Sequence, residues 1–584
     1  MYLRGHARGA RRRPGAARVI LAAMFAAASL AAAAGPNPIQ SENALGGTEP
    51  SAWLQPPTPP TSIEGYASEI SVLPGEQVHL HVSTNDGYRY TVELYRLGWY
   101  GGLGARLVTC SPSCGGDEVG QHYGPHIESG LIRADWPVTD TLSIPSTAVS
   151  GYYYALLRLT SGGDDTGKRG WAAFVVRDPP TRHSQIVVQV PVNTWQAYNP
   201  WGGKSLYPFN STDLVPAARV SFDRPLAFTA QGPFDWEYNL VRFLEREGYD
   251  VSYQTDVDTD ARPESLLDHR LAIVNGHDEY WTKRMRDAFN DARAASTNLA
   301  FLGSNDAYWQ VRYENGQRTI VGYKDAAPDP EPSPALRTIR FRSLSPARPE
   351  CALMGVMFLR LREHQSGPVD YTVTNAAAAD PWFSGSGFVP GDKVLDVVGN
   401  EWDSLPDPPA PAICVKPQLK VLFHYEGSPA NADAVRYTAT SGARVFAGGA
   451  QQLSWSLDNF NLTRFGRTLP ADTRMQQFIR NALADLTRPA RPTSLQVTVQ
   501  GRMVTLKAKG HADPRVKFQS FKHAGAAPFA LTDAGVAKLC KNKTGNCVIR
   551  NVAPGNYRYA VVTVDDWGKS LPIFTAKVVV PPPQ

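Results

Sequence analysis

Apolar and polar residues alternate with a period of two over much of the first third of the chain. Residues 78–82 and 90–95 place apolar side chains on one face of an extended strand. Further strands are predicted at residues 152–160 and 171–176, and Gly, Asp and Asn turns separate these runs. Many short strands joined by turns predict an Ig-like β-sandwich over residues 61–178.

After Pro179-Pro180 the pattern changes, and strands begin to alternate with helices. Short apolar runs predict strands at residues 184–192, 250–253, 270–274, 298–302 and 444–447. Helices are predicted where apolar residues recur at helical spacing: residues 234–247, a segment capped by Thr282, and residues 475–486. This alternation predicts a central α/β domain with a mostly parallel sheet over residues 179–488. Residues 325–440, rich in Pro and Gly, give no readable pattern.

The last part of the chain returns to alternation. A Pro-rich linker near residues 489–492 precedes alternating runs at 495–499, 504–506 and 557–564. Together with the turn at residues 565–570, these runs resemble a fibronectin type III module, a spacer or binding domain, over residues 489–584. The predicted fold class is therefore multidomain: a central α/β domain between two all-β modules.

The beginning of the chain is typical of an export signal. Residues 1–35 hold six Arg and no acid, followed within that range by an Ala-rich apolar stretch at 19–34. That stretch is short for a membrane span of about 20 residues, so we predict a signal peptide over 1–35, a linker or extended arm over 36–60, and no stable membrane span after cleavage. The Ala/Arg-rich signal favours a secreted bacterial protein.

Charge changes this picture little. The formal charge of +5 falls to −1 without the six Arg of residues 1–35, because 53 basic residues then face 54 acidic ones. A near-neutral body is a poor match for nucleic-acid binding, which depends on phosphate neutralisation. The 42% of hydrophobic residues suffices for large cores and excludes a disordered or collagen-like chain.

The six cysteines agree with an exported protein. They lie in three near pairs, and although fifteen connectivities are open, local pairing is the simplest. No C-x-x-C is present, which argues against zinc, and disulfides argue against a cysteine nucleophile. The predicted disulfides join Cys110 with Cys114, Cys351 with Cys414, and Cys540 with Cys547.

Common catalytic signatures such as G-x-S-x-G and H-E-x-x-H are absent, so topology is the better guide. In an open parallel sheet, ligands bind beyond the carboxyl ends of the strands. Three polar and aromatic clusters follow predicted strands, at residues 193–199, 275–281 and 303–305, and we expect them to converge.

His277 and Glu279 are two residues apart and share one face of an extended segment. Such a pair binds a metal, moves a proton, or does both. The structural alternative places Glu279 at the start of a helix and packs His277 under Trp281. For Tyr198 the alternative is a packed ring with a bonded hydroxyl, and for Tyr238 an exposed position in the first turn of its helix.

Three segments together resemble the large subunit of N,N-dimethylformamidase and its secreted relatives. They are residues 198–207 (YNPWGGKSLY), residues 276–281 (GHDEYW) and residues 302–305 (LGSN), within a similarity that covers roughly residues 180–485. The upstream segments EGY at 64–66 and YRLGWYGG at 95–102 look like the sandwich that precedes this domain in those relatives.

The resemblance implies a mononuclear Fe(III) site held by Tyr198, Tyr238 and Glu279, with His277 and Asn305 as active-site groups and a further acid at Glu401. Phenolate and carboxylate are hard anionic oxygen donors suited to Fe³⁺. The implied reaction is hydrolysis of a small-molecule or peptide-like amide by iron-activated water. The family enzyme also works with a small partner subunit, and an oligomer is compatible with the sequence.

Two alternatives remain open at this point. One is a secreted, non-catalytic protein that binds glycan or the cell envelope, with a degenerate or structural metal site. The other is a divalent-metal hydrolase, against which the lack of a second histidine near Glu279 argues.

Overall fold

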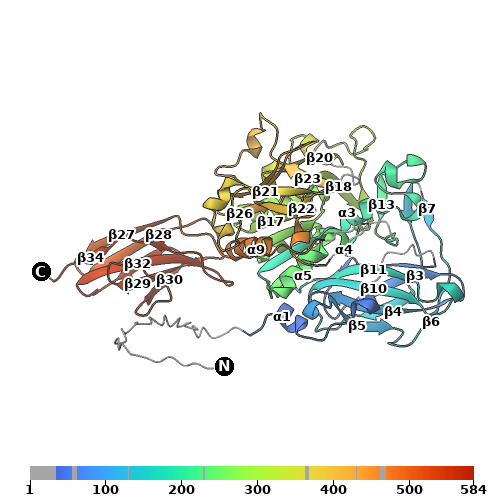
Figure 1. The fold of residues 1–584 in the computed structure, drawn as a ribbon, viewed down its shortest axis with the longest axis horizontal. Coiled ribbons are helices and arrows are strands. Elements are labelled where there is room, and N and C mark those ends of the chain that lie inside the picture. The colour runs from blue at the N-terminus through green and yellow to red at the C-terminus, as the bar shows by residue number, and fades with distance from the viewer. Residues whose placement is uncertain are drawn as a thin grey trace, which may run out of the picture. The chain divides into compact units, whose positions relative to one another are not determined.

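The computed structural model describes residues 35–54, 62–128, 130–227, 231–361, 367–428, 430–460 and 469–583. The predicted signal peptide therefore lies outside the described residues, except for its last position. Residues 37–584 form one compact unit made mostly of β-sheets with few helices (Figure 1). None of the helices in the described ranges is long and apolar enough to cross a membrane.

The predicted arm over residues 36–60 is partly helical. Helix α1 spans Pro38–Asn43 and α2 spans Pro50–Trp53. Asn37 caps α1, because its side chain accepts a hydrogen bond from the backbone of Gln40. Ile39 and Trp53 are buried in the main core, so the segment packs on the protein instead of extending away from it.

The N-terminal β-region consists of two sheets. One has three strands, in the order β1 (Ile63–Ala67), β3 (Gln77–Thr84) and β9 (Asp140–Ser143). The other runs β2 (Ser71–Val72), β11 (Arg169–Val176), β10 (Gly151–Leu159), β4 (Arg89–Leu97) and β5 (Ala105–Ser111), with β6 (Glu118–Val119) paired to β4. Strand β10 is buried on both faces: Leu157 points into the core between the sheets and Leu156 into the central core. This explains why residues 152–157 are continuously apolar.

The central sheet has nine strands and is mixed, which corrects the prediction of a mostly parallel α/β domain. Its first five strands are parallel and its remaining pairs antiparallel. The order is β14 (Val251–Thr255), β12 (Ile186–Val190), β15 (Leu271–Gly276), β17 (Asn298–Gly303), β26 (Arg444–Ala447), β25 (Ala432–Thr438), β24 (Lys420–Tyr425), β21 (Val369–Val373) and β22 (Lys393–Val398). The antiparallel half comes from the Pro- and Gly-rich stretch, where the alternation of strands and helices ends.

The helices of this region are short. They are α3 (Val192–Ala197), α4 (Pro233–Trp236), α5 (Tyr238–Arg246), α6 (Asp256–Ala261), α7 (Lys283–Ala294), α8 (Cys351–Met354) and α9 (Thr473–Leu486). Helix α7 follows its predicted design: Thr282 accepts a hydrogen bond from the backbone of Met285, and Phe289 is buried. The helix predicted at residues 234–247 is divided at Glu237 into α4 and α5.

Two smaller sheets complete the region around the nine-stranded sheet. One runs β16 (Tyr280–Thr282), β18 (Trp309–Glu314), β19 (Thr319–Val321), β13 (Arg219–Ser221), β8 (Leu131–Arg133) and β7 (His126–Glu128). The other pairs β20 (Met357–Leu361) with β23 (Glu401–Ser404). Strands β7 and β8 lie within the predicted sandwich range, yet β8 pairs with β13 of the central region.

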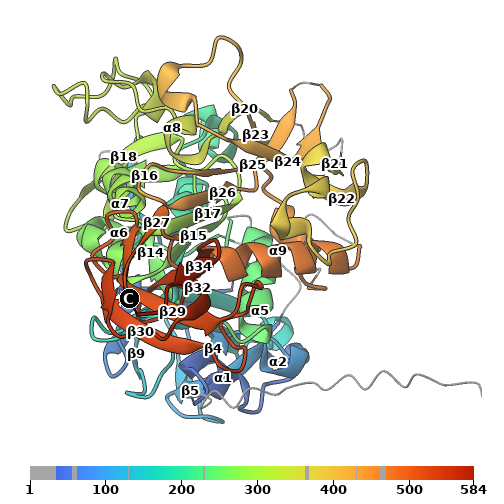
Figure 2. The same ribbon diagram turned by 90° about the vertical axis from the view of Figure 1, so that its left-hand side faces the viewer.

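The C-terminal strands form two sheets (Figure 2). These are β27 (Ser494–Gln500), β28 (Met503–Lys509) and β31 (Asn546–Ile549), and β30 (Ala537–Asn542), β29 (Lys517–Ala524), β32 (Gly555–Val564), β33 (Ile573–Phe574) and β34 (Val578–Val580). Buried Arg270 contacts this region, since its Nη1 lies 2.8 Å from Asp513. The three near pairs of cysteines are disulfides: Cys110–Cys114, Cys351–Cys414 and Cys540–Cys547.

Candidate active site

Polar side chains converge where the parallel strands of the central sheet end. Strand β12 leads into α3 and Tyr198, β15 leads into His277 and Glu279, and β17 leads into Asn305. The strand ends approach closely: a Cβ on Gly303 would lie 1.8 Å from the carbonyl oxygen of Gly276, so this position admits only glycine. The chain therefore delivers the three clusters to one place.

Two tyrosines converge on one carboxylate. The Tyr198 hydroxyl donates to Oε2 of Glu279 at 2.8 Å, and the Tyr207 hydroxyl lies 2.9 Å from both Glu279 oxygens. The backbone N–H of Glu279 donates to Thr194 at 3.0 Å, which fixes the carboxylate from α3. Burial, together with the charge of Glu401, raises the pKa of Glu279. Burial and the Glu279 charge hold the pKa of both tyrosines well above the ordinary value, so without a cation the phenols stay protonated.

A buried imidazole lies between two carboxylates. His277 Nε2 is 2.9 Å from Oε2 of Glu401 and 3.6 Å from Oε2 of Glu279, and Nδ1 is 3.1 Å from Oε1 of Gln231. Burial alone would lower the pKa of His277, but the nearby carboxylates of Glu401, Glu279 and Asp278 outweigh it and raise the pKa. The site thus favours a proton on this ring.

Glu401 is held at the end of β17 by main-chain and side-chain contacts. Asn305 Nδ2 donates to Oε2 of Glu401 at 2.8 Å, and Ser304 Oγ donates to the Glu401 carbonyl at 2.8 Å. The backbone N–H of Asn305 donates to Asp403 on β23 at 2.9 Å. Asn305 has a φ of 55°, a left-handed conformation that asparagine tolerates better than most residues. The sequence-predicted residues Tyr198, His277, Glu279, Asn305 and Glu401 therefore belong to one connected cluster.

The structure does not bring Tyr238 to this cluster. Its hydroxyl donates to the carbonyl of Gly104 at 2.5 Å, and its ring packs on Trp53 and Phe460. Tyr238 is also buried, not exposed in the first turn of its helix. The expected role as a ligand rested on order and spacing, but the first turn of α5 faces the N-terminal region. Tyr207 is instead the second tyrosine that contacts Glu279. The only sequence feature that pointed to it was its place in the run of residues 198–207.

A half-buried lysine with a buried amino group also faces the cluster. Lys324, which follows β19, places Nζ 3.0 Å from the centre of the Tyr207 ring and 5.1 Å from that of Tyr280. Within the described part of the chain its Nζ has no hydrogen-bond partner. Burial lowers the pKa of Lys324 to about 7, against the opposing attraction of Glu279 and Glu401. No sequence motif pointed to Lys324, which directly precedes the stretch from residue 325 in which the sequence shows no regular pattern.

The donor set suits a hard trivalent cation. Two phenol oxygens and a carboxylate lie within hydrogen-bond distance of one another, and three such anions would balance Fe³⁺. Among the described residues, no group of three or more His, Cys, Asp or Glu side chains is arranged to hold a metal ion. A metal at this place therefore needs the two tyrosine oxygens.

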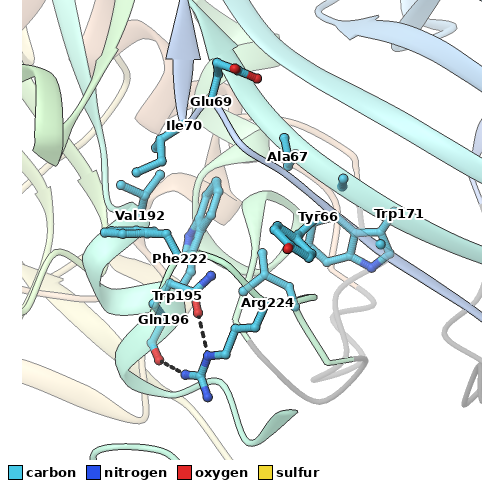
Figure 3. A pocket seen from close by; sticks show the side chains of 14 residues that line it. Tyr66, Ala67, Glu69, Ile70, Trp171, Val192, Trp195, Gln196, Phe222 and Arg224 are labelled. Atoms are coloured by element: carbon cyan, nitrogen blue, oxygen red, sulfur yellow. Dashed lines mark hydrogen bonds between the residues drawn. The ribbon is translucent and has the colours of Figure 1, made fainter. Parts of the chain in front are cut away.

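A separate hollow lies near α3 and does not compete as the substrate site. Tyr66, Trp171 and Trp195 line it, and Arg224 Nε and Nη2 donate to the side chain and carbonyl of Gln196 (Figure 3). Its volume of about 40 Å³ holds only a few water molecules.

Acid, imidazole, amide and phenol side chains gather at the buried ends of the strands, as in sites that carry out acid–base chemistry. The chain belongs to the N,N-dimethylformamidase beta subunit-like family, because the model of that family's C-terminal part matches residues 91–465. Membership suggests an amide hydrolase. No curated protein matches the chain.

Two solved structures illustrate the similarity, each over a part of the chain. The fibronectin type-III domain of human fibronectin type III domain containing protein 3 is 15% identical and has a TM-score of 0.14, over 16% of this chain and 88% of that one. The mmIFT52 N-terminal domain is 8% identical with a TM-score of 0.22, over 41% of this chain and 86% of that one. Likenesses at these TM-scores carry no argument about function.

Proposed function

We propose that the protein is an exported, Fe(III)-dependent hydrolase of carbon–nitrogen bonds in small-molecule or peptide-like amides. The observation that carries the proposal is the contact of the Tyr198 and Tyr207 hydroxyls with Glu279. These three residues would hold a single ferric ion, with Tyr207 in the place first expected for Tyr238. When bound, the ion would supply Lewis acidity toward an amide carbonyl and a water molecule.

The remaining groups would move and orient protons. At a pH above its raised pKa, His277 would accept the proton of the attacking water and then deliver that proton to the departing amine. Glu401 would hold the imidazole at Nε2, and Asn305 would orient Glu401 through one N–H while keeping its second N–H for the substrate oxygen. The products would be a carboxylate and an amine.

Metal analysis with a visible spectrum tests the iron site. We expect about one iron per chain and a phenolate-to-iron band that is lost or shifted in Tyr198→Phe and Tyr207→Phe. Tyr238→Phe is the matched control, because that hydroxyl contacts Gly104 and not Glu279. A colourless protein that gains no band on reconstitution with ferric iron would sink the proposal and leave the non-catalytic binding protein in the lead.

A further inference from the structure

Three large apolar side chains stand exposed beside the candidate site. Phe209 is 65% exposed, Leu214 71% and Val215 56%. Phe209 lies in η4 (Pro208–Asn210), Leu214 ends η5 (Thr212–Leu214) and Val215 follows it directly. We call these three residues the apolar lip. Grouped apolar exposure of this kind marks binding surfaces more often than single exposed residues do.

The lip is built into the fold. Lys204 Nζ donates to the carbonyls of Thr212 at 3.2 Å and Val215 at 2.7 Å. Asn210 Nδ2 donates to the Tyr198 carbonyl at 2.9 Å, which ties the segment to the candidate ligand. These bonds tie the backbone of the lip to the segment that carries Tyr198 and Lys204.

The backbone of the lip adopts an uncommon conformation. Asp213 and Leu214 have φ values of 58° and 56°, in the left-handed region. For a residue other than glycine this conformation costs about 1–2 kcal/mol. Strain of this kind persists where the surrounding structure imposes it, often at ligand-binding segments. Here the left-handed backbone coincides with an exposed Leu214 side chain.

The lip contacts the site through Phe209, whose ring packs at a tilt on two tyrosine rings. The Phe209 ring centre lies 5.1 Å from that of Tyr207 and 6.4 Å from that of Tyr198. Both of these tyrosines contact Glu279 through their hydroxyls. The exposed ring of Phe209 therefore contacts the two tyrosines that bind the carboxylate where chemistry is proposed.

We propose that the apolar lip binds the apolar substituent of the substrate, so that the preferred substrates are amides carrying a medium or long alkyl chain. The assignment rests on the proposed function, because the ring path ends at Glu279. Three side chains expose far less surface than the ~800 Å² per partner of a typical protein interface, which favours a small amphipathic molecule over a protein. The substrate's amide would lie at Glu279 and its chain along Tyr207, Phe209 and Leu214.

Turnover of acetamide, hexanamide and decanamide by the iron-loaded full chain tests the lip. We expect kcat/KM to rise about twofold for each added methylene, since partial burial yields part of the full transfer effect. In a Phe209→Ser/Leu214→Ser/Val215→Ser variant the ratio of kcat/KM for decanamide to that for acetamide falls at least about tenfold. A Val389→Ser/Leu395→Ser control removes apolar side chains of similar exposure elsewhere, 58% and 51%, and keeps the ratio.

Measuring the binding of decanamide by calorimetry tests the role of the lip independently of whether the protein hydrolyses amides. Binding by the wild type that weakens at least about tenfold in the lip variant supports the lip even if no amide is hydrolysed. Hydrolysis with an unchanged chain-length ratio in the lip variant overturns the lip and leaves the proposed function standing. If the protein forms a dimer that the lip substitutions dissociate, while the ratio of kcat/KM for decanamide to that for acetamide is unchanged, the lip is a contact between two copies of the chain. That result also overturns the proposed binding of the substrate's alkyl chain.

Discussion

His277 Nε2 lies 2.9 Å from Oε2 of Glu401, a residue that is distant in sequence and reaches the site on β23. The same carboxylate oxygen accepts a hydrogen bond from Asn305. A carboxylate held in this way fixes the orientation of the imidazole and stabilises its protonated form. The pair links the end of β15 to the two-stranded sheet of β20 and β23.

Glu401→Gln is expected to lower amide hydrolysis about 10- to 100-fold, as losses of such supporting groups typically do. Because Glu401 raises the pKa of His277, its neutralisation should lower that pKa and move the acidic limb of the pH–rate profile to lower pH. Asp433→Asn is the matched control, since Asp433 forms a similar pair with His424 Nδ1 at 2.7 Å. An unchanged pH profile in Glu401→Gln would refute the assigned role of Glu401.

Lys324→Met is expected to change the visible spectrum of the iron-loaded protein. The cation over the Tyr207 ring stabilises electrons on the phenolate, so its removal should move the phenolate-to-iron band to longer wavelength. The spectrum should be recorded near pH 6, where Lys324, with a pKa of about 7, is mostly charged. Lys416→Met is the control: its Nζ lies 5.7 Å from the ring of Tyr437, a residue outside the cluster. A band at the wild-type wavelength in Lys324→Met would contradict this interpretation.

Local sequence patterns predicted the elements that depend on local rules. Thr282 caps α7 as expected, and strands β12, β15, β17 and β26 lie where short apolar runs indicated. The antiparallel half of the central sheet could not be predicted, because strands β21, β22, β24 and β25 lie in the Pro- and Gly-rich stretch, where the sequence shows no regular pattern. Strand β10 shows a related limit: its apolar run indicates two buried faces, but the sequence does not reveal which regions cover them.

The candidate site was predictable where strand ends determined it. The clusters after β12, β15 and β17 meet because neighbouring parallel strands end at one edge of a sheet. Tyr238 was misplaced because its position in the chain does not reveal which way the first turn of α5 faces. Tyr207 and Lys324 reach Glu279 from loops, whose paths follow from tertiary packing alone.

The buried ion pair of Arg96 and Glu245 predicts a large effect on stability. Arg96 Nη2 lies 2.9 Å from Oε1 of Glu245, and both side chains are fully buried between β4 and α5. Arg96→Met should lower the free energy of unfolding by about 3–5 kcal/mol, because it leaves a carboxylate buried without its partner. The double variant Arg96→Met/Glu245→Leu should be less destabilised in urea denaturation than Arg96→Met alone. Arg158 forms a partly exposed ion pair with Glu93, so Arg158→Met should lower the free energy of unfolding by less than about 1 kcal/mol.

Buried His269 predicts a defined dependence of stability on pH. Burial lowers the pKa of His269 to about 4, and its Nδ1 lies 2.8 Å from the carbonyl of Ser184. The unfolded chain, with an ordinary histidine pKa near ~6.5, then binds more protons than the folded chain between about pH 4 and 6.5. The stability contributed by the neutral ring is therefore complete above pH 6.5 and decreases as the pH falls through this window, by up to about 1.4 kcal/mol per pH unit.

His269→Gln should remove this contribution. The gap in free energy of unfolding between the wild type and His269→Gln should narrow as the pH is lowered from 7 to 5, in urea denaturation or calorimetry at each pH. His126→Gln is the control, because His126 is half exposed and its replacement shows the effect on stability of losing a histidine at the surface. If the gap stays constant over this range, the folded protein does not hold His269 neutral and its assigned pKa is wrong.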